Sequence, residues 1–160
     1  MIELFHGSNV KIDEIDLSFG KRGKDFGRGF YLSDNKMQAQ KMAELVTSRE
    51  EYGEPTISTF LFDEGCIKNG ALNVRIFENY SIEWAEFVVR NRTNNSKSSA
   101  HDYDIVWGPI ANDTVGVQIR RYILNYIDIN RLIEELKYIR PTFQYFFGTE
   151  ESLKYLKRVR

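Results

Sequence analysis

The stretch Asp25-Phe26-Gly27-Arg28-Gly29-Phe30-Tyr31-Leu32-Ser33-Asp34 places two glycines around an arginine and continues into aromatic residues and a Ser-Asp pair. A glycine lets the backbone approach a ligand closely because it has no Cβ, and arginine carries a planar, permanently charged fork that suits phosphate. Tyr31 adds a flat ring with a hydroxyl group. Together these residue types favour a nucleotide-type ligand. The same stretch predicts a strand over residues 29–32 and a helix capped by Ser33 or Asp34.

A second strand end with polar character lies upstream, at Phe5-His6-Gly7-Ser8, and closes a strand that we expect to begin at Ile2. A single histidine at a strand end is more often a structural residue than a catalytic one. A tyrosine in a strand likewise more often packs in the core. Neither His6 nor Tyr31 indicates a site by itself, so the prediction of a site depends on the two motifs occurring together.

The remaining segments alternate irregularly between helical and extended patterns, which predicts an α+β fold in a single domain covering residues 1–160. Apolar residues at helical spacing predict four helices, with these inward faces in chain order: Ala39, Met42, Ala43 and Val46; Ile82, Ala85 and Val89 after a Ser81 cap; Val115, Ile119, Tyr122, Ile123 and Tyr126; Leu132, Ile133 and Leu136. Strands are expected over residues 57–62, 72–77, 104–107 and 143–147. Gly108-Pro109 is expected to end the strand over residues 104–107. The strand over residues 143–147 is expected to be the last one, and Thr149 is expected to cap a C-terminal helix after it.

Composition narrows the function classes. The chain has 22 basic and 23 acidic residues, so it has no general electrostatic reason to bind nucleic acid or a membrane surface. Two histidines and one cysteine give no visible zinc site. Cys66 has no partner for a disulfide and is expected to be buried or to lie at a strand edge. No apolar run reaches the ~20 residues of a membrane span, and the N-terminus does not resemble a signal peptide. We therefore expect a cytoplasmic protein without a membrane partner.

The motifs resemble those of the ADP-ribosyltransferase fold. Poly-ADP-ribose polymerases have a His-Gly-Ser strand end and then Phe-Gly-Lys-Gly-Ile-Tyr-Phe-Ala-Asp, which residues 26–34 match nearly residue for residue. Residues 144–147, Gln-Tyr-Phe-Phe, resemble their third motif, Glu-Tyr-Ile-Val. From position 5 to 147 the chain also resembles an uncharacterised bacterial family of this fold, domain of unknown function 3990, which shares a central Gly-Pro-Ile-Ala-x-Asp with residues 108–113. The resemblance implies a split β-sheet core surrounded by helices.

The resemblance also implies NAD+ as co-substrate and assigns roles by position. His6 would hydrogen-bond the adenosine ribose, backbone groups of Gly7 would clamp the nicotinamide carboxamide, and Ser8 occupies the matching serine position. Tyr31 would stack on nicotinamide, and Gln144 would contact the nicotinamide ribose. The implied catalytic residues are His6, Tyr31 and Gln144, and the implied NAD+-binding residues are His6, Gly7, Ser8, Gly27, Arg28, Gly29 and Tyr31. The side chain of Arg28 could either contact the pyrophosphate of NAD+ or be exposed to solvent, and both alternatives stay open.

Two positions depart from the polymerase pattern. Gln144 replaces a glutamate, and its neutral amide supplies no negative charge, which implies transfer of one unit and not chain elongation. Asp113 and Glu150 are candidates for the missing carboxylate, although Asp113 also fits a helix cap. Where the polymerases have a serine and a second stacking tyrosine, residues 38–42 read Gln-Ala-Gln-Lys-Met, so the stacking would depend on Met42.

The leading hypothesis is a mono-ADP-ribosyltransferase that uses NAD+ to modify an unknown protein or nucleic-acid acceptor. Small bacterial proteins of this type resemble toxins of toxin–antitoxin or phage-defence modules, which implies an antitoxin protein as a further partner. An NAD+ glycohydrolase would have the same site, and Gln144 also fits a catalytically inactive NAD-binding or interaction module. The loop before residue 29 contains a group of basic residues: Lys21, Arg22, Lys24 and Arg28. This group fits either a nucleic-acid acceptor or a charged loop that is simply solvated.

Overall fold

Two β-sheets organise the chain in the computed structural model, which describes residues 1–159. The first sheet has the order β1-β3-β7 and the second the order β2-β6-β5-β4, and all neighbours are antiparallel except the parallel pair β4 and β5. The strands are β1 (Ile2–Ser8), β2 (Phe30–Leu32), β3 (Thr56–Phe62), β4 (Val74–Ile76), β5 (Ile105–Ile110), β6 (Thr142–Phe147) and β7 (Leu156–Arg158). The sheets meet where Phe5 and Ser33 exchange two backbone hydrogen bonds of 2.8 and 2.9 Å.

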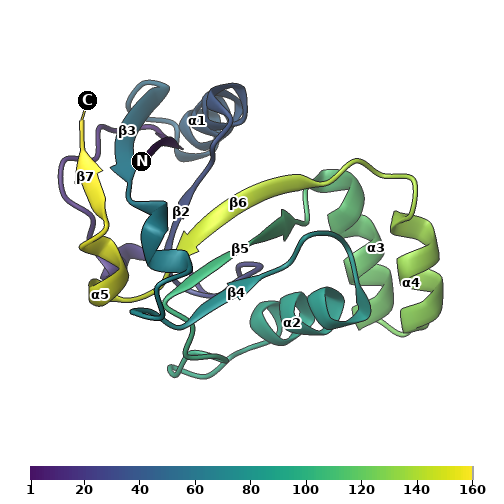
Figure 1. Cartoon of the computed structure of the whole chain (residues 1–160). Coiled ribbons are helices and arrows are strands. Elements are labelled where there is room, and N and C mark those ends of the chain that lie inside the picture. Colours follow the sequence, from purple (N-terminus) through teal and green to yellow (C-terminus); the bar gives the residue numbers. More distant parts are fainter. Residues whose placement is uncertain (160) are drawn as a thin grey trace.

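Five α-helices surround these sheets (Figure 1), which makes the chain a mixed α+β domain. The helix α1 packs along β1, while α2, α3 and α4 group together beside the second sheet. The helices are α1 (Lys36–Glu50), α2 (Ile82–Arg92), α3 (Asp113–Ile123), α4 (Ile129–Leu136) and α5 (Glu150–Leu153), and two short 3₁₀ turns cover Leu17–Phe19 and Glu64–Ile67.

The second sheet separates two hydrophobic cores. Because side chains along a strand alternate between faces, β5 and β6 contribute to both cores. Val106 and Phe146 pack into the first core, against α2, α3 and α4. Ile105 and Phe147 pack into the second core, which lies against β1 and β3 of the first sheet. Cys66 is buried in this second core, which is one of the two placements that the sequence predicted.

Local sequence signals set the helix starts, with one correction. Ser81 accepts a hydrogen bond from the N–H of Trp84 and Thr149 forms a capping box with Ser152, so both predicted caps are confirmed. The cap of α1 is Asn35 and not Ser33 or Asp34. The backbone of Ser33 is engaged with Phe5, which keeps Ser33 extended and delays the start of the helix.

Three predicted inward residues face solvent instead. Met42 is 37% exposed because α1 packs through a narrow stripe in which only Ala39 and Ala43 are buried. Ile82 is 40% exposed because α2 turns a different face inward, formed by Trp84, Ala85, Phe87, Val88 and Asn91. Tyr126 is 74% exposed. It follows the end of α3, where the left-handed backbone of Asn125 at φ 63° turns the chain away from the helix axis.

The prediction that Gly108-Pro109 ends a strand is wrong, because β5 continues to Ile110 and pairs Pro109 with Phe143. Proline lacks an N–H and is tolerated where no neighbouring strand needs that donor. The parallel partner β4 ends at Ile76, opposite Trp107, so position 109 lies beyond the end of the β4 ladder. The strand over residues 143–147 is not the last one either, since β7 follows it and pairs with β3.

No helix of the described residues is long and apolar enough to cross a membrane. Within the same part of the chain, no group of three or more His, Cys, Asp or Glu side chains is arranged to hold a metal ion.

Candidate functional site

His6 follows Phe5, the residue of β1 that forms the backbone bridge to Ser33 at the end of β2. Its Nδ1 is 2.8 Å from the backbone oxygen of Tyr31, and its ring stacks on Phe30 with centroids 4.3 Å apart. Because a carbonyl only accepts hydrogen bonds, Nδ1 carries the proton and Nε2 presents a lone pair. The imidazole is therefore oriented by the strand next to it.

Burial sets the charge of this imidazole. Desolvation lowers the pKa of His6 from its ordinary value of 6.5, and the hydrogen bond to Tyr31 opposes that shift only in part. A neutral ring with Nε2 free accepts a hydrogen bond and does not donate one there. The geometry therefore suits His6 to hold a hydroxyl group.

Gly7 presents its backbone at the open edge of β1. In an antiparallel pair, alternate residues direct both backbone groups to the same neighbour. Phe5 directs its N–H and C=O to Ser33, on the side of β1 away from β3. The N–H and C=O of Gly7 therefore point to the same side, where the β2 segment has already turned into α1. A Cβ added at Gly7 would collide with the backbone carbonyl of Ala39, which shows how closely α1 packs on the face of β1 at this position.

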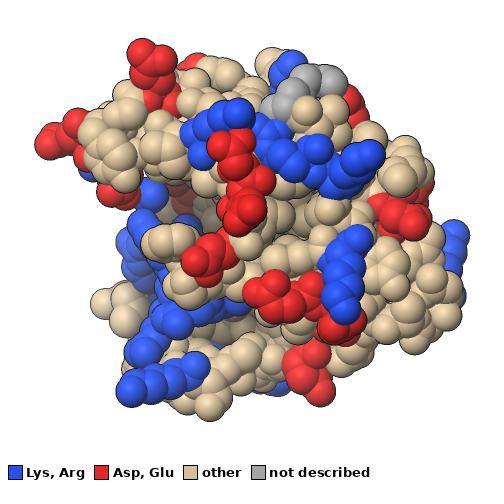
Figure 2. Space-filling model, turned by 90° about the vertical axis from the view of Figure 1, so that its left-hand side faces the viewer, with Lys and Arg blue, Asp and Glu red and all other residues tan. Residues whose placement is uncertain are grey.

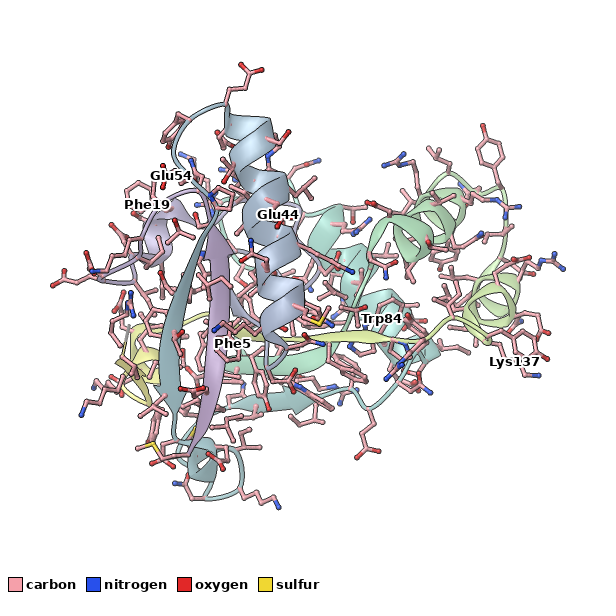
Figure 3. All side chains as sticks on the ribbon, turned by 90° about the horizontal axis from the view of Figure 1, so that it is seen from above. Phe5, Phe19, Glu44, Glu54, Trp84 and Lys137 are labelled. Atoms are coloured by element: carbon pink, nitrogen blue, oxygen red, sulfur yellow. The ribbon has the colours of Figure 1, made fainter. Side chains whose placement is uncertain are left out.

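The view from above places the elements around this edge (Figure 3). The helix α1 runs beside β1 and β3, and Phe5 lies near the N-terminal end of α1. The ammonium of Lys36 is 6.0 Å from the centre of the Phe5 ring. Ser8 ends β1 and donates a hydrogen bond of 3.2 Å to Oδ1 of Asn9.

The hydroxyl of Tyr31 is tied to the loop before its own strand. It donates to the oxygen of Gly27 at 2.6 Å and accepts from the N–H of Phe26 at 3.1 Å. Burial raises the pKa of this hydroxyl well above 10.0, so Tyr31 stays protonated and cannot act as a base. The ring lies edge-on to Phe146 with centroids 5.4 Å apart and packs against the first core, and the residue as a whole is half-buried.

Three residues that the sequence analysis did not identify hold this loop in place. Asp25 receives Nε of Arg92 and the N–H of Ala111, each at 2.6 Å. His101 places Nε2 2.6 Å from the oxygen of Phe26 and accepts from the N–H of Tyr103 through Nδ1. Only Asp25 belongs to a recognisable motif, and nothing in the local sequence indicates that Arg92 and His101 approach it.

Gly27 and Arg28 line a hollow on the outer side of the same loop. Its volume is about 140 Å³, and residues from 91 to 100 form its other wall. Gly27 has φ 96°, a left-handed conformation that favours glycine. Gly29 lies on the sheet side of the loop, where an added Cβ would collide with the ring of Phe146.

Gln144 lies on β6 opposite Gly108 and is half-buried. Phe146, two residues further along β6, pairs with Tyr31, so Gln144 and Tyr31 share one face of the second sheet. Among the described residues its amide has no hydrogen-bond partner. This is the face of the second sheet that carries the first core.

The two candidate carboxylates lie at opposite ends of the second sheet. Asp113 is exposed in the first turn of α3, behind its cap Asn112, so the prediction that Asp113 caps this helix is wrong by one residue. Glu150 is exposed in the first turn of α5. Met42, the candidate stacking residue, points into solvent from α1.

The structure therefore joins only part of the predicted site. His6, Tyr31 and Gly27 are linked by hydrogen bonds, and Gln144 shares the face of Tyr31. The ring of His6 packs on Phe30, the neighbour of Tyr31 along β2, so the rings of His6 and Tyr31 project to opposite faces of β2. His6 and Tyr31 are therefore connected only through the backbone of β2, whose Tyr31 carbonyl binds the His6 ring.

Residues 2–158 match the family model described as protein of unknown function (DUF3990). The chain belongs to this family. It has no significant match among curated proteins or among solved structures. The predicted resemblance to domain of unknown function 3990 is confirmed, while the description of this family assigns no activity.

The arrangement in this DUF3990 chain offers three kinds of chemistry near β2. His6 offers a neutral acceptor, the β1 edge offers the N–H and C=O of Gly7 side by side, and Tyr31 offers an aromatic ring that packs against the first core. No member of this set is a nucleophile or a charged acid. Such a set orients a polar ligand but needs the ligand itself to carry the reacting bond.

Proposed function

We propose that this protein is a mono-ADP-ribosyltransferase that uses NAD+ as a co-substrate and modifies a macromolecular acceptor. The observation that carries the proposal is His6 held on the Tyr31 carbonyl, with a lowered pKa, next to Gly7, whose backbone faces away from β3. The motif resemblance assigns these positions to the ribose and the carboxamide of NAD+. The two-sheet architecture, joined at the Phe5–Ser33 bridge, is compatible with a split ADP-ribosyltransferase-like core.

The chemistry suits these groups. Nicotinamide leaves NAD+ as a neutral molecule, so the reaction needs no general acid, and positive charge develops on the ribose as in glycoside cleavage. Nε2 of His6 would accept a hydrogen bond from a ribose hydroxyl, and the N–H and C=O of Gly7 would bind the amide of nicotinamide. The protein would then contribute mainly orientation and exclusion of water.

Gln144 sets the expected strength of catalysis. A carboxylate at this position would stabilise the developing ribose cation, whereas the amide supplies only hydrogen bonds. We therefore expect slow transfer of single units. Replacing Gln144 by glutamate should raise the rate of NAD+ cleavage by about tenfold or more, because electrostatic stabilisation at such a position is typically worth a few kcal/mol.

The test uses the purified protein, NAD+ labelled in its adenylate half, and a cell extract as the source of acceptors. Label on a macromolecule supports the transferase. Free ADP-ribose without labelled macromolecule would replace the proposal by an NAD+ glycohydrolase, and NAD+ that stays intact would replace it by a non-catalytic module.

Three variants make this test specific. His6→Ala should lower NAD+ turnover about a hundredfold or more, Gln144→Glu should raise it, and Lys157→Ala, an exposed change on β7, should leave it unchanged. A thermal melt of each variant separates loss of activity from loss of fold. Equal activity of the wild type and a folded His6→Ala variant would refute the role of His6.

A further inference from the structure

The hollow beside Gly27 is built from two loops that are far apart in sequence. Residues 22–28 form one wall and residues 91–100 the other. Nη1 of Arg22 donates a hydrogen bond of 3.3 Å to the backbone oxygen of Asn95, which ties the walls together. The volume of about 140 Å³ is suited to a small polar group.

The hollow carries a concentrated positive charge. Arg22, Arg28 and Lys97 line it, and none of the described residues that line it is acidic. None of these three cations is in an ion pair within the described part of the chain. Figure 2 shows how unevenly charge is spread over one face of the molecule, with Lys and Arg side chains gathered down one edge.

A neighbouring lysine, Lys24, lies close to further cations that are outside the hollow. Burial lowers the pKa of Lys24 first, and the positive charges of Arg49 and Lys21 lower it further. Asp25 acts in the opposite direction and is itself occupied by Arg92. The net charge of the whole chain is −1, so this local excess is a property of the loop and not of the overall composition.

Asn91 adds an independent sign that the hollow receives a ligand. Its side chain is 2% exposed and lines the hollow, and its Nδ2 donates to the oxygen of Phe87 at 2.9 Å. That bond identifies which end of the amide is nitrogen. The other end, Oδ1, is buried without any hydrogen-bond partner, and a buried acceptor without a donor is unfavourable.

We propose that this hollow binds a ribose phosphate, with the phosphate among Arg22, Arg28 and Lys97 and a ribose hydroxyl donating to Oδ1 of Asn91. The cations match the negative phosphate oxygens, and the hydroxyl satisfies the orphan acceptor. Inorganic phosphate would meet only the first requirement. The site does not depend on the proposed transferase activity, because ribose phosphates occur in NAD+ and in other nucleotides.

The test is calorimetric titration of the full chain at low salt with ribose 5-phosphate and, as the matched ligand without a hydroxyl group, methyl phosphate. Ribose 5-phosphate should bind saturably, and methyl phosphate should bind about fivefold more weakly, as expected for one lost hydrogen bond. Absence of saturable binding would overturn the proposal. Equal affinity of the two ligands would overturn the role of Asn91.

Charge-removing variants locate the binding. Arg28→Gln and Lys97→Gln should each weaken ribose 5-phosphate binding by about tenfold, whereas Lys157→Gln, on exposed β7 away from the hollow, should change it by less than about twofold. Both residues of the hollow are exposed, so these variants should fold. Equal weakening by all three variants would mean diffuse attraction and would refute a site.

A competition arm identifies the source of the ribose phosphate. Displacement of ribose 5-phosphate by NAD+ assigns the hollow to NAD+, while unchanged binding in saturating NAD+ assigns it to a separate phosphorylated ligand; either result supports the site. His6→Ala should not change ribose 5-phosphate binding. A failure of the transferase proposal is thereby distinguished from a failure of this one.

Discussion

At the scale of single residues, both histidines of the chain are engaged with backbone oxygens. His6 is held by Tyr31 and His101 by Phe26. Desolvation is the main cause that lowers the pKa of each ring below 6.5. Both rings therefore stay neutral in the folded protein under conditions in which free histidines begin to take up protons.

The lower pKa of both histidines in the folded protein predicts how its stability depends on pH. The unfolded chain protonates both histidines near pH 6.5, whereas the folded chain resists protonation until lower pH. The free energy of unfolding should therefore be constant above about pH 7 and fall as the pH drops below about 6.5, by at most about 1.4 kcal/mol per pH unit for each histidine. Urea unfolding measured from pH 7.5 to 5 tests this, with His6→Gln expected to reduce the slope. Stability that rises toward pH 5 would contradict it.

Tyr31 allows a second prediction at this scale. Tyr31→Phe keeps the ring but removes the hydroxyl that binds Gly27 and Phe26, so it should lower the free energy of unfolding by about 1–3 kcal/mol. Tyr145→Phe is the matched control, because no hydrogen bond involves the Tyr145 hydroxyl in the described part of the chain. That control should change stability by less than about 0.5 kcal/mol. Equal effects of the two variants in denaturant titrations would show that the Tyr31 hydroxyl is not a structural tie.

At the scale of elements, the close approach of α1 to β1 shapes the candidate site. Gly7 faces the backbone of Ala39 without an intervening side chain, which brings the helix against the face of the strand at this position. The loop before β2 is held from the other side by the Asp25–Arg92 pair. The site is thus positioned by one helix–strand contact and one ion pair, and each can be tested separately.

Gly7→Ala should be severely destabilising. A Cβ there would force α1 away from β1, and overpacking of this kind costs about 1–3 kcal/mol or more. Gly116→Ala is a control of opposite sign: position 116 lies inside α3, and the nearest atom to an added Cβ is 3.8 Å away. Alanine should stabilise that helix by about 0.5–1 kcal/mol. Melting temperatures of the two variants that shift in the same direction would contradict the packing argument.

Arg92→Ala tests the anchor of the loop. Asp25 and Arg92 have side chains that are 11% and 24% exposed, and removing one partner of a buried pair leaves an uncompensated charge, at a cost of about 2–4 kcal/mol. Lys154→Ala removes an exposed pair with Glu151, with both side chains more than 60% exposed, and should cost about 0–1 kcal/mol. The two variants are compared by urea unfolding. A difference near zero would mean that the buried pair does not anchor the loop.

At the scale of the whole molecule, the second sheet is shared by both cores. Its strands β5 and β6 place alternate residues into each core, so neither core can open without exposing one face of the same strands. The chain should therefore unfold in a single cooperative transition. Unfolding followed by near-ultraviolet circular dichroism of the tryptophans and by amide exchange in β1 and β3 should give the same midpoint. Earlier exchange in β1 and β3 would indicate two independent units.

Much of the fold follows from local patterns. The strand at residues 57–62, the Ser81 cap and the helix over Leu132–Leu136 were predictable, because periodicity and capping depend on residues close in the chain. The continuation of β5 through Pro109 was not, since it depends on where β4 ends. Met42 and Ile82 were misplaced because helical spacing alone does not tell how wide the buried stripe is or which face turns inward.

The candidate site divides in the same way. The sequence by itself determined the two motif-bearing strand ends, the family of the chain and the residue types that suit a nucleotide. Only the tertiary structure decided that Arg92 and His101 hold the Asp25–Gly27 loop, that Gly7 directs its backbone to an open edge, and that Oδ1 of Asn91 is left without a hydrogen-bond partner beside a basic hollow with Arg28. The physical reason is that these contacts join segments far apart in the chain, and their meeting depends on how two sheets and their helices pack, which no local pattern encodes.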